Sequence, residues 1–216
     1  KFYQMKIKTE NIFTGILVIC ALIVTILFLR KEFSSNNSKL NISIVENWKE
    51  LISEDEKANS EYPKVYLIEF FDYECSYCSI LDATLDTIQS KYGNKIKIIR
   101  YHFPLNIHPL AYRIAIAAEC AGTQDVFDSY HKELMANQYK LNSINFTEVA
   151  RLIGIKDIEK FQKCVNEEET ADVISHDVQL AKKFNVNGTP TLIINNKMIS
   201  GVVDSKEIEE IIKEFL

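Results

Sequence analysis

The sequence has little net charge, and this shortage limits the partners that it can be expected to bind. Lysine and arginine number 25, aspartate and glutamate number 30, and the formal net charge is -5. The two signs are mixed along the chain, so the composition gives no reason to expect nucleic acid as a partner. A length of 216 residues with 47% hydrophobic content is enough for one buried domain and an additional segment.

Charged residues are missing altogether from residues 12–29, IFTGILVICALIVTILFL. An uncharged apolar stretch of this length can span a bilayer, so it predicts a transmembrane anchor or a signal sequence. The run is longer than the apolar core of a usual signal peptide, and no small-residue cleavage site follows it. We therefore expect an uncleaved anchor that follows a cytoplasmic segment at residues 1–11. The alternative is a cleaved signal peptide, which would leave a soluble periplasmic protein.

Residues 30–43 are polar and lack apolar periodicity, which predicts a tether between the anchor and a folded domain. The folded domain is expected to span residues 44–216. At its start, Trp48, Leu51 and Ile52 predict one short amphipathic helix before Pro63.

The folded part opens with a strand, helix, strand pattern. The continuous apolar run KVYLIEFF, residues 64–71, is typical of a strand buried on both faces. Apolar residues then recur at helical spacing from Cys75 to Tyr92, and Gly93 follows them. KIKIIRYHF, residues 95–103, alternates as a strand does. This order and length predict a right-handed βαβ unit.

The middle of the chain lacks strand patterns. From about residue 106 to residue 184 the apolar spacing predicts only helices, separated by glycine, asparagine or polar breaks. Residues 189–201, TPTLIINNKMISG, predict a β-hairpin, and residues 205–216 predict a closing helix. The expected fold class is therefore α/β, a thioredoxin-like βαβ…ββα fold with an all-helical subdomain inserted at about residues 106–183, preceded by one transmembrane helix.

Cys75 and Cys78 lie where the first strand of the folded domain meets its helix. A thiol at a helix N-terminus feels the positive end of the macrodipole and free backbone N–H groups, which favour the thiolate. Cys75 is therefore expected to be the reactive nucleophile of a redox-active disulfide. Cys78, one turn further on, is expected to be more buried and to attack a mixed disulfide at Cys75, which releases the partner.

Two other uses of these thiols stay open. Cys75 and Cys78 could bind a metal together with His102 and His108, although the two histidines lie at a strand end and in a loop instead of in a tight pair. A purely structural disulfide would contribute little, because its loop is so short. A redox-inert or metal-carrying binding module is thus the alternative of a different class. We expect no bound metal and no cofactor.

Five segments of the sequence match one family. The chain resembles the DsbA family of thiol:disulfide oxidoreductases, in the membrane-anchored branch that includes BdbD, over residues 64–216. The segments are EFFDYECSYC, YHFPLNIHPLA, AAECAG, FQKCV and VNGTPTLIINNKMISG, of which the first and last are diagnostic. The resemblance implies an enzyme that works outside the cytoplasm on exported cysteine-containing proteins and is reoxidised by a membrane partner.

The resemblance also implies roles for three further residues. Pro190 would have a cis peptide bond that faces the dithiol, and Thr189 would present its backbone to an extended substrate peptide. Glu69 would lie beneath the dithiol and pass protons to Cys78. An ionisable side chain in a buried strand is otherwise costly, which supports this interpretation of Glu69.

The strongest oxidants of the family carry a histidine just before the second cysteine, and this chain does not. The dipeptide here is Ser76-Tyr77, and Asp72 and Glu74 flank the site with negative charge that disfavours a thiolate. We therefore expect a weaker oxidant than those members. Isomerases of this kind usually dimerise through an added domain, for which the tether is too short. A monomeric oxidase is expected, while isomerase and reductase activities stay open.

Cys120 and Cys164 both fall on apolar faces of helices predicted in the insertion. Two buried thiols in one small subdomain of an extracytoplasmic protein are expected to form a structural disulfide. The alternative is two separate free cysteines that act as small apolar side chains.

Overall fold

The structure is a computed structural model that describes residues 9–35, 40–52 and 63–216, and it divides into two units, residues 1–40 and 41–216. The first unit consists of helix α1 (Thr9–Ser35), whose large apolar side chains between Ile16 and Phe28 are exposed. Over the described residues, no helix has the length and apolarity that crossing a membrane requires. The anchor expected at residues 12–29 stays a prediction, and most of the segment expected at 1–11 lies outside the described residues.

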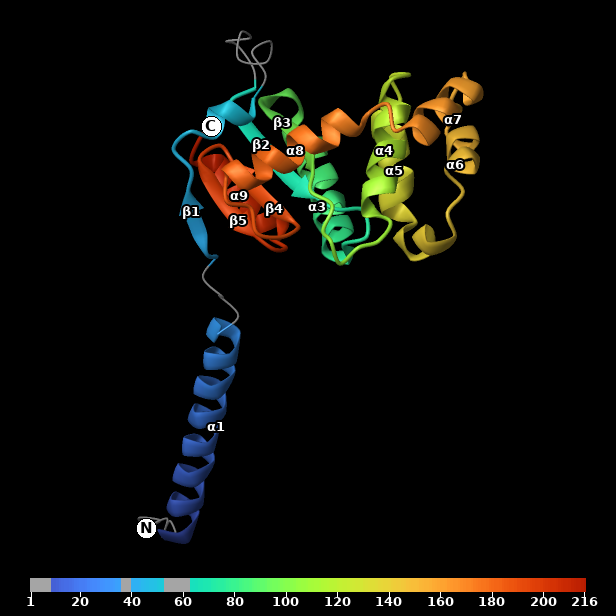
Figure 1. The fold of residues 1–216 in the computed structure, drawn as a ribbon. Coiled ribbons are helices and arrows are strands. Elements are labelled where there is room, and N and C mark those ends of the chain that lie inside the picture. The colour runs from blue at the N-terminus through green and yellow to red at the C-terminus, as the bar shows by residue number, and fades with distance from the viewer. Residues whose placement is uncertain (1–8, 36–39, 53–62) are drawn as a thin grey trace, which may run out of the picture. The chain divides into compact units, whose positions relative to one another are not determined.

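The second unit is built on a five-stranded mixed sheet with helices on both faces (Figure 1). The strand order is β1-β5-β4-β2-β3, in which β2 pairs in parallel with β3 and antiparallel with β4. Strands β4 and β5 form an antiparallel hairpin, and β1 pairs antiparallel with β5 at the edge of the sheet. The strands are β1 (Ile42–Ile44), β2 (Val65–Phe71), β3 (Ile96–His102), β4 (Thr191–Ile194) and β5 (Lys197–Ser200).

Helices make up the rest of this unit. Helix α3 connects the parallel strands β2 and β3, and the helices from α4 to α8 form a continuous insertion between β3 and β4 (Figure 1). The α-helices are α3 (Ser76–Tyr92), α4 (Ala111–Gly122), α5 (Phe127–Ala136), α6 (Phe146–Leu152), α7 (Ile158–Glu167), α8 (Ala171–Lys183) and α9 (Ser205–Lys213). Short 3-10 helices are η1 (Trp48–Leu51), η2 (Gly93–Lys95) and η3 (Gln138–Ser143). The predicted α/β fold with a helical insertion is confirmed.

All seven residues of β2 are buried because this strand lies between β3 and β4 and is covered on both faces. Side chains alternate between the faces of a strand. Ile68 and Phe70 accordingly pack in one cluster with Ala181 of α8, whereas Phe71 packs in another with Cys78 of α3. Glu69 shares the face of Phe71, so the strand directs an ionisable side chain toward the dithiol helix.

Two elements differ from the predictions. Strand β1 begins at the end of the expected tether, and α1 continues to Ser35, so residues 30–43 are not a tether throughout. The three exposed residues of β1 carry no readable pattern, and only pairing with β5 (Ile42 opposite Ile199) defines the strand. The short helix expected before Pro63 is a single 3-10 turn, η1, since Leu51 and Ile52 are buried against the sheet after one turn.

Candidate active site

The dithiol lies where β2 leads into α3. Cys75 is the N-cap residue of α3, and Cys78 lies one turn inside the helix, where its backbone N–H donates to the Cys75 carbonyl at 2.9 Å. Both thiols are free in this structure. Cys75 is 7% exposed and Cys78 is 0% exposed, so an incoming sulfur can reach only Cys75 without movement of the helix.

The surroundings drive the pKa values of the two thiols in opposite directions. The pKa of Cys75 is lowered from its usual 9.0 to about 5, mainly by a hydrogen bond from the Cys78 thiol, which outweighs the opposing effect of burial. The backbone N–H groups of Tyr77 and Cys78 lower it further. Burial, followed by the bond to Cys75, raises the pKa of Cys78. Cys75 is therefore a thiolate at neutral pH, stabilised by a protonated Cys78.

Thr189 and Pro190 lie against the nucleophile. The Thr189-Pro190 peptide bond is cis, and the Cys75 sulfur is 3.3 Å from the Thr189 carbonyl oxygen. The Thr189 hydroxyl is buried and has no hydrogen-bond partner among the described residues. The backbone expected to receive a substrate peptide is thus next to the sulfur expected to react.

Glu69 is a fully buried carboxyl group close enough to influence both thiols. Neither of its oxygens has a hydrogen-bond partner in the described structure, and its nearest cation is Arg100, with Nε at 3.8 Å. Burial raises the pKa of Glu69 from 4.5 to about 8, and the charge of Arg100 offsets only part of this. The charge of Glu69 contributes in turn to the raised pKa of Cys78. Such an acid can hold and release a proton near neutral pH.

The sequence did not reveal a series of buried, hydrogen-bonded polar side chains that begins at Arg100. Asp82 of α3 accepts hydrogen bonds from Arg100 Nη2 at 2.7 Å and from His131 Nε2 at 3.0 Å. His131 Nδ1 is 3.0 Å from the hydroxyl of Tyr73. Although burial raises the pKa of Asp82, the bond from His131 and the charges of His131 and Arg100 lower it to about 2.

The direction of each hydrogen bond among these buried side chains follows from the ionised state of Asp82. A carboxylate only accepts, so His131 must donate through Nε2. Burial lowers the pKa of His131, which leaves its Nδ1 free to accept from the Tyr73 hydroxyl. The only sequence signal was the position of Asp82, four residues after Cys78 and therefore on the same buried face of the helix.

The carboxylates that flank the dithiol are directed away from it. Asp72 accepts from the backbone N–H of Leu105 and from His108 Nδ1, both at 2.8 Å. Glu74 accepts from Leu110 N at 2.6 Å and Ala111 N at 2.7 Å, which are the first N–H groups of α4. The pKa of Cys75 is lowered in spite of these two carboxylates, so the thiolate is the favoured form.

The two histidines considered as metal ligands have other partners. His102 Nε2 is 2.8 Å from Glu119, and His108 is bonded to Asp72. No three His, Cys, Asp or Glu side chains among the described residues form a group that could hold a metal.

Cys120 and Cys164 are joined in a disulfide with an S–S distance of 1.97 Å and a Cα–Cα distance of 5.8 Å. The bond connects α4 to α7, and both cysteines are buried in the core of the helical insertion. The structure therefore brings together the pair for which the sequence indicated a structural role.

Comparison with known proteins gives a family and a set of similar folds. A family model described as thioredoxin matches residues 60–214. BdbD from Bacillus subtilis in its oxidised form has a TM-score of 0.63 and 23% identity, covering 70% of this chain and 86% of that chain. The thiol-disulfide exchange protein alpha-DsbA2 from Wolbachia pipientis has a TM-score of 0.63 and 20% identity, covering 76% and 91%. A periplasmic thioredoxin-like protein from Salmonella enterica serovar Typhimurium has a TM-score of 0.56 and 26% identity, covering 71% and 85%.

Curated relatives match over only part of their length. The Na(+)/H(+) antiporter NhaA 1 from Mycobacterium sp. (strain KMS) is 31% identical over 145 residues, which are 66% of this chain and 24% of the antiporter. The chain thus spans about a quarter of the length of the curated relatives that it matches.

Proposed function

Because this chain belongs to the thioredoxin family and has the fold of DsbA-like proteins, we propose that it is a thiol:disulfide oxidoreductase that forms disulfides in exported cysteine-containing proteins. The family model and the similar folds confirm the predicted resemblance, and they support the predicted enzyme class. The observation that carries the finer proposal is the opposed shift of two neighbouring thiols, with the pKa of Cys75 lowered to about 5 and that of Cys78 raised.

The proposed reaction starts from the oxidised site, a Cys75–Cys78 disulfide. A substrate thiolate attacks the Cys75 sulfur, the bond between the substrate and Cys75 forms, and Cys78 leaves. Glu69 supplies the proton that the departing Cys78 takes up, which its pKa of about 8 supports. A second substrate thiolate then attacks the substrate sulfur of the mixed disulfide, and Cys75 leaves as a stable thiolate. The substrate loses two electrons, and the dithiol gains them.

Thr189 and Pro190 are proposed to hold the substrate. An extended peptide would pair with the backbone at Thr189 and so bring its cysteine to Cys75. The 3.3 Å distance between the Cys75 sulfur and the Thr189 carbonyl supports this role, because backbone pairing there leaves the peptide beside the reacting sulfur.

The proposed location is outside the cytoplasm. The Cys120–Cys164 disulfide supports it, since structural disulfides persist in oxidising compartments. The protein would be held at the membrane by residues 12–29 or released as a soluble protein after cleavage there. A membrane partner that accepts two electrons from the dithiol would restore the Cys75–Cys78 disulfide after each turnover, and the protein would act as a monomer.

The equilibrium redox potential against glutathione tests the proposal. A lowered pKa at Cys75 stabilises the reduced site and makes its disulfide more oxidising, so we expect a potential between about -120 and -200 mV. The oxidised protein should also introduce disulfides into a reduced, unfolded substrate protein, and a Cys75→Ala variant should not. A potential near about -270 mV would instead indicate a reductase.

A further inference from the structure

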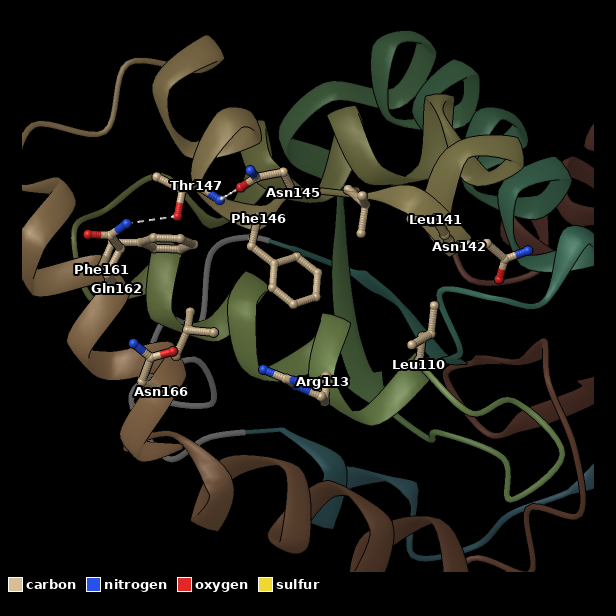
Figure 2. A pocket seen from close by; sticks show the side chains of 12 residues that line it. Leu110, Arg113, Leu141, Asn142, Asn145, Phe146, Thr147, Phe161, Gln162 and Asn166 are labelled. Atoms are coloured by element: carbon tan, nitrogen blue, oxygen red, sulfur yellow. Dashed lines mark hydrogen bonds between the residues drawn. The ribbon is translucent and has the colours of Figure 1, made fainter.

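The helical insertion contains an open pocket of about 450 Å³ between α4, η3, α6 and α7. This volume is within the range of roughly 300 to 1,000 Å³ that is typical of ligand sites. The floor is apolar, with Leu141 and Phe161 buried beneath it and Leu110 partly exposed. Figure 2 shows that the ring of Phe146 points into the same space.

Exposed polar side chains surround this floor. Asn142, Gln162 and Asn166 contribute neutral amides, which can both donate and accept hydrogen bonds. Arg113 is the only charged side chain among the described residues that line the pocket, and Figure 2 shows it beside the apolar floor. Its guanidinium group forms no ion pair within the described part of the chain. The pocket therefore matches a ligand that carries an apolar group next to a carboxylate.

The pocket adjoins the segment that carries the nucleophile. Leu110, at one end of the pocket, donates its N–H to Glu74, the residue before Cys75. Gln138 donates to the carbonyl of Cys75 at 3.0 Å and begins η3, which supplies Leu141 and Asn142 to the pocket. An extended chain advances about 3.3 Å per residue. A substrate whose cysteine lies at Cys75 can thus reach the pocket with a few more residues.

We propose that this pocket is a second substrate subsite, which binds an apolar residue and an adjacent acidic residue of an extended polypeptide a few positions away from its reacting cysteine. The inference rests on the proposed function, because it names the substrate class of the same dithiol. Arg113 binds the carboxylate, the apolar floor takes the neighbouring side chain, and the amide rim bonds to the peptide backbone. The subsite would favour unfolded segments, since a folded protein does not expose such a stretch.

The test measures binding without disulfide chemistry. Short fluorescent peptides carry serine in place of the reacting cysteine and a Leu-Asp or a Leu-Lys pair at varied distance from it, and fluorescence anisotropy gives the Kd. We expect the full-length protein to prefer the Leu-Asp series. Arg113→Glu should weaken that binding by about fivefold, as for reversal of a partly exposed charge pair, and should strengthen binding of the Leu-Lys series.

The matched control is Arg151→Glu, which makes the same charge change at an exposed position of α6 outside the pocket. It should leave both Kd values at the wild-type level. Equal effects of the two variants, or no preference between the peptides, would overturn the subsite. If the wild-type protein shows the Arg113-dependent preference but does not oxidise the cysteine forms of the peptides, the proposed function fails and the binding site stands.

Discussion

The two cysteine pairs of the folded unit are built for different tasks. Cys75 and Cys78 share one helix start, have opposed pKa shifts, and leave only Cys75 slightly exposed, at 7%. Cys120 and Cys164 lie 44 residues apart on two helices, and both are buried. On the chain-entropy model the first pair would close a loop worth about 2 kcal/mol and the second a loop worth about 4 kcal/mol. A pair with opposed pKa shifts and one thiol that solvent can reach suits exchange, whereas a fully buried pair across a long loop suits stability.

The largest expected effect comes from breaking the asymmetric pair. Cys78→Ala should lower turnover by at least about a thousandfold, because the site can no longer cycle between dithiol and disulfide. The remaining Cys75 thiolate should accumulate mixed disulfides with substrate proteins, since no neighbouring thiol can resolve them. Mass spectrometry of non-reduced protein measures this. If Cys75→Ala traps partners and Cys78→Ala does not, the two roles are reversed.

The second prediction breaks the buried pair. Cys164→Ala should lower the free energy of unfolding by about 4 kcal/mol and Tm by about 10 °C, because it releases the loop that connects α4 to α7. Thermal unfolding measures the loss, and alkylation of Cys75 should proceed at the wild-type rate. The double variant Cys120→Ala/Cys164→Ala controls for side reactions of the remaining thiol. A loss of Cys75 reactivity in both variants would show that the two pairs are not independent.

The third prediction concerns the acid beneath the dithiol. Glu69→Gln should slow thiol exchange by about a hundredfold, because an amide cannot supply a proton to Cys78. The effect should be greatest below pH 8, where the carboxyl group is protonated in the folded protein. Exchange rates that match the wild type across this range would remove Glu69 from the mechanism.

The same substitution should change the pH dependence of stability. The pKa of Glu69 is about 8 in the folded protein against a usual value of 4.5, so the unfolded chain releases this proton first. The carboxyl group therefore lowers stability progressively as pH rises from 4.5 to 8, by a few kcal/mol in all. Denaturant unfolding should show that Glu69→Gln flattens this decline. Equal slopes in the two proteins would mean that Glu69 is ionised at neutral pH.

Local sequence patterns were sufficient for the framework of the site. The apolar run of β2 and the spacing of α3 depend on neighbours in the chain, so they fixed the position of Cys75 and Cys78 correctly. The contact between Asp82 and His131 joins residues 49 positions apart, and the bond from Gln138 to Cys75 joins residues 63 positions apart. Such contacts arise from the way the insertion packs on the sheet, for which the sequence contains no periodic signal.

The fourth prediction tests one of those long-range contacts. Asp82 holds Arg100 at 2.7 Å, whereas Glu69 is 3.8 Å from the same guanidinium group. Asp82→Asn should shift the positive charge toward Glu69 and remove a negative charge that raises its pKa, so the pH profile of exchange should move to lower pH. Asp86→Asn, one turn further along α3 at an exposed ion pair with Lys132, is the matched control and should leave the profile unchanged. Identical pH profiles for both variants would show that Asp82 and its buried hydrogen-bond partners do not affect thiol exchange.

The smallest effect should come from substitution of Glu74. This carboxylate lies next to the reactive Cys75 in the sequence, but its hydrogen bonds stabilise the helical insertion, so it tests whether the two regions are independent. Its Oε2 accepts from Leu110 N and Ala111 N, two of the free donors at the start of α4. Glu74→Ala should therefore lower the free energy of unfolding by about 1 kcal/mol, as for loss of a helix cap. Glu74→Gln, which keeps an acceptor oxygen, should lose less. The pKa of Cys75, followed by the ultraviolet absorbance of its thiolate, should stay near 5 in both variants because the carboxylate is bonded to the start of α4 instead of to the thiol. A marked fall of that pKa in Glu74→Ala would show that the charge of Glu74 disfavours the Cys75 thiolate, as the sequence suggested.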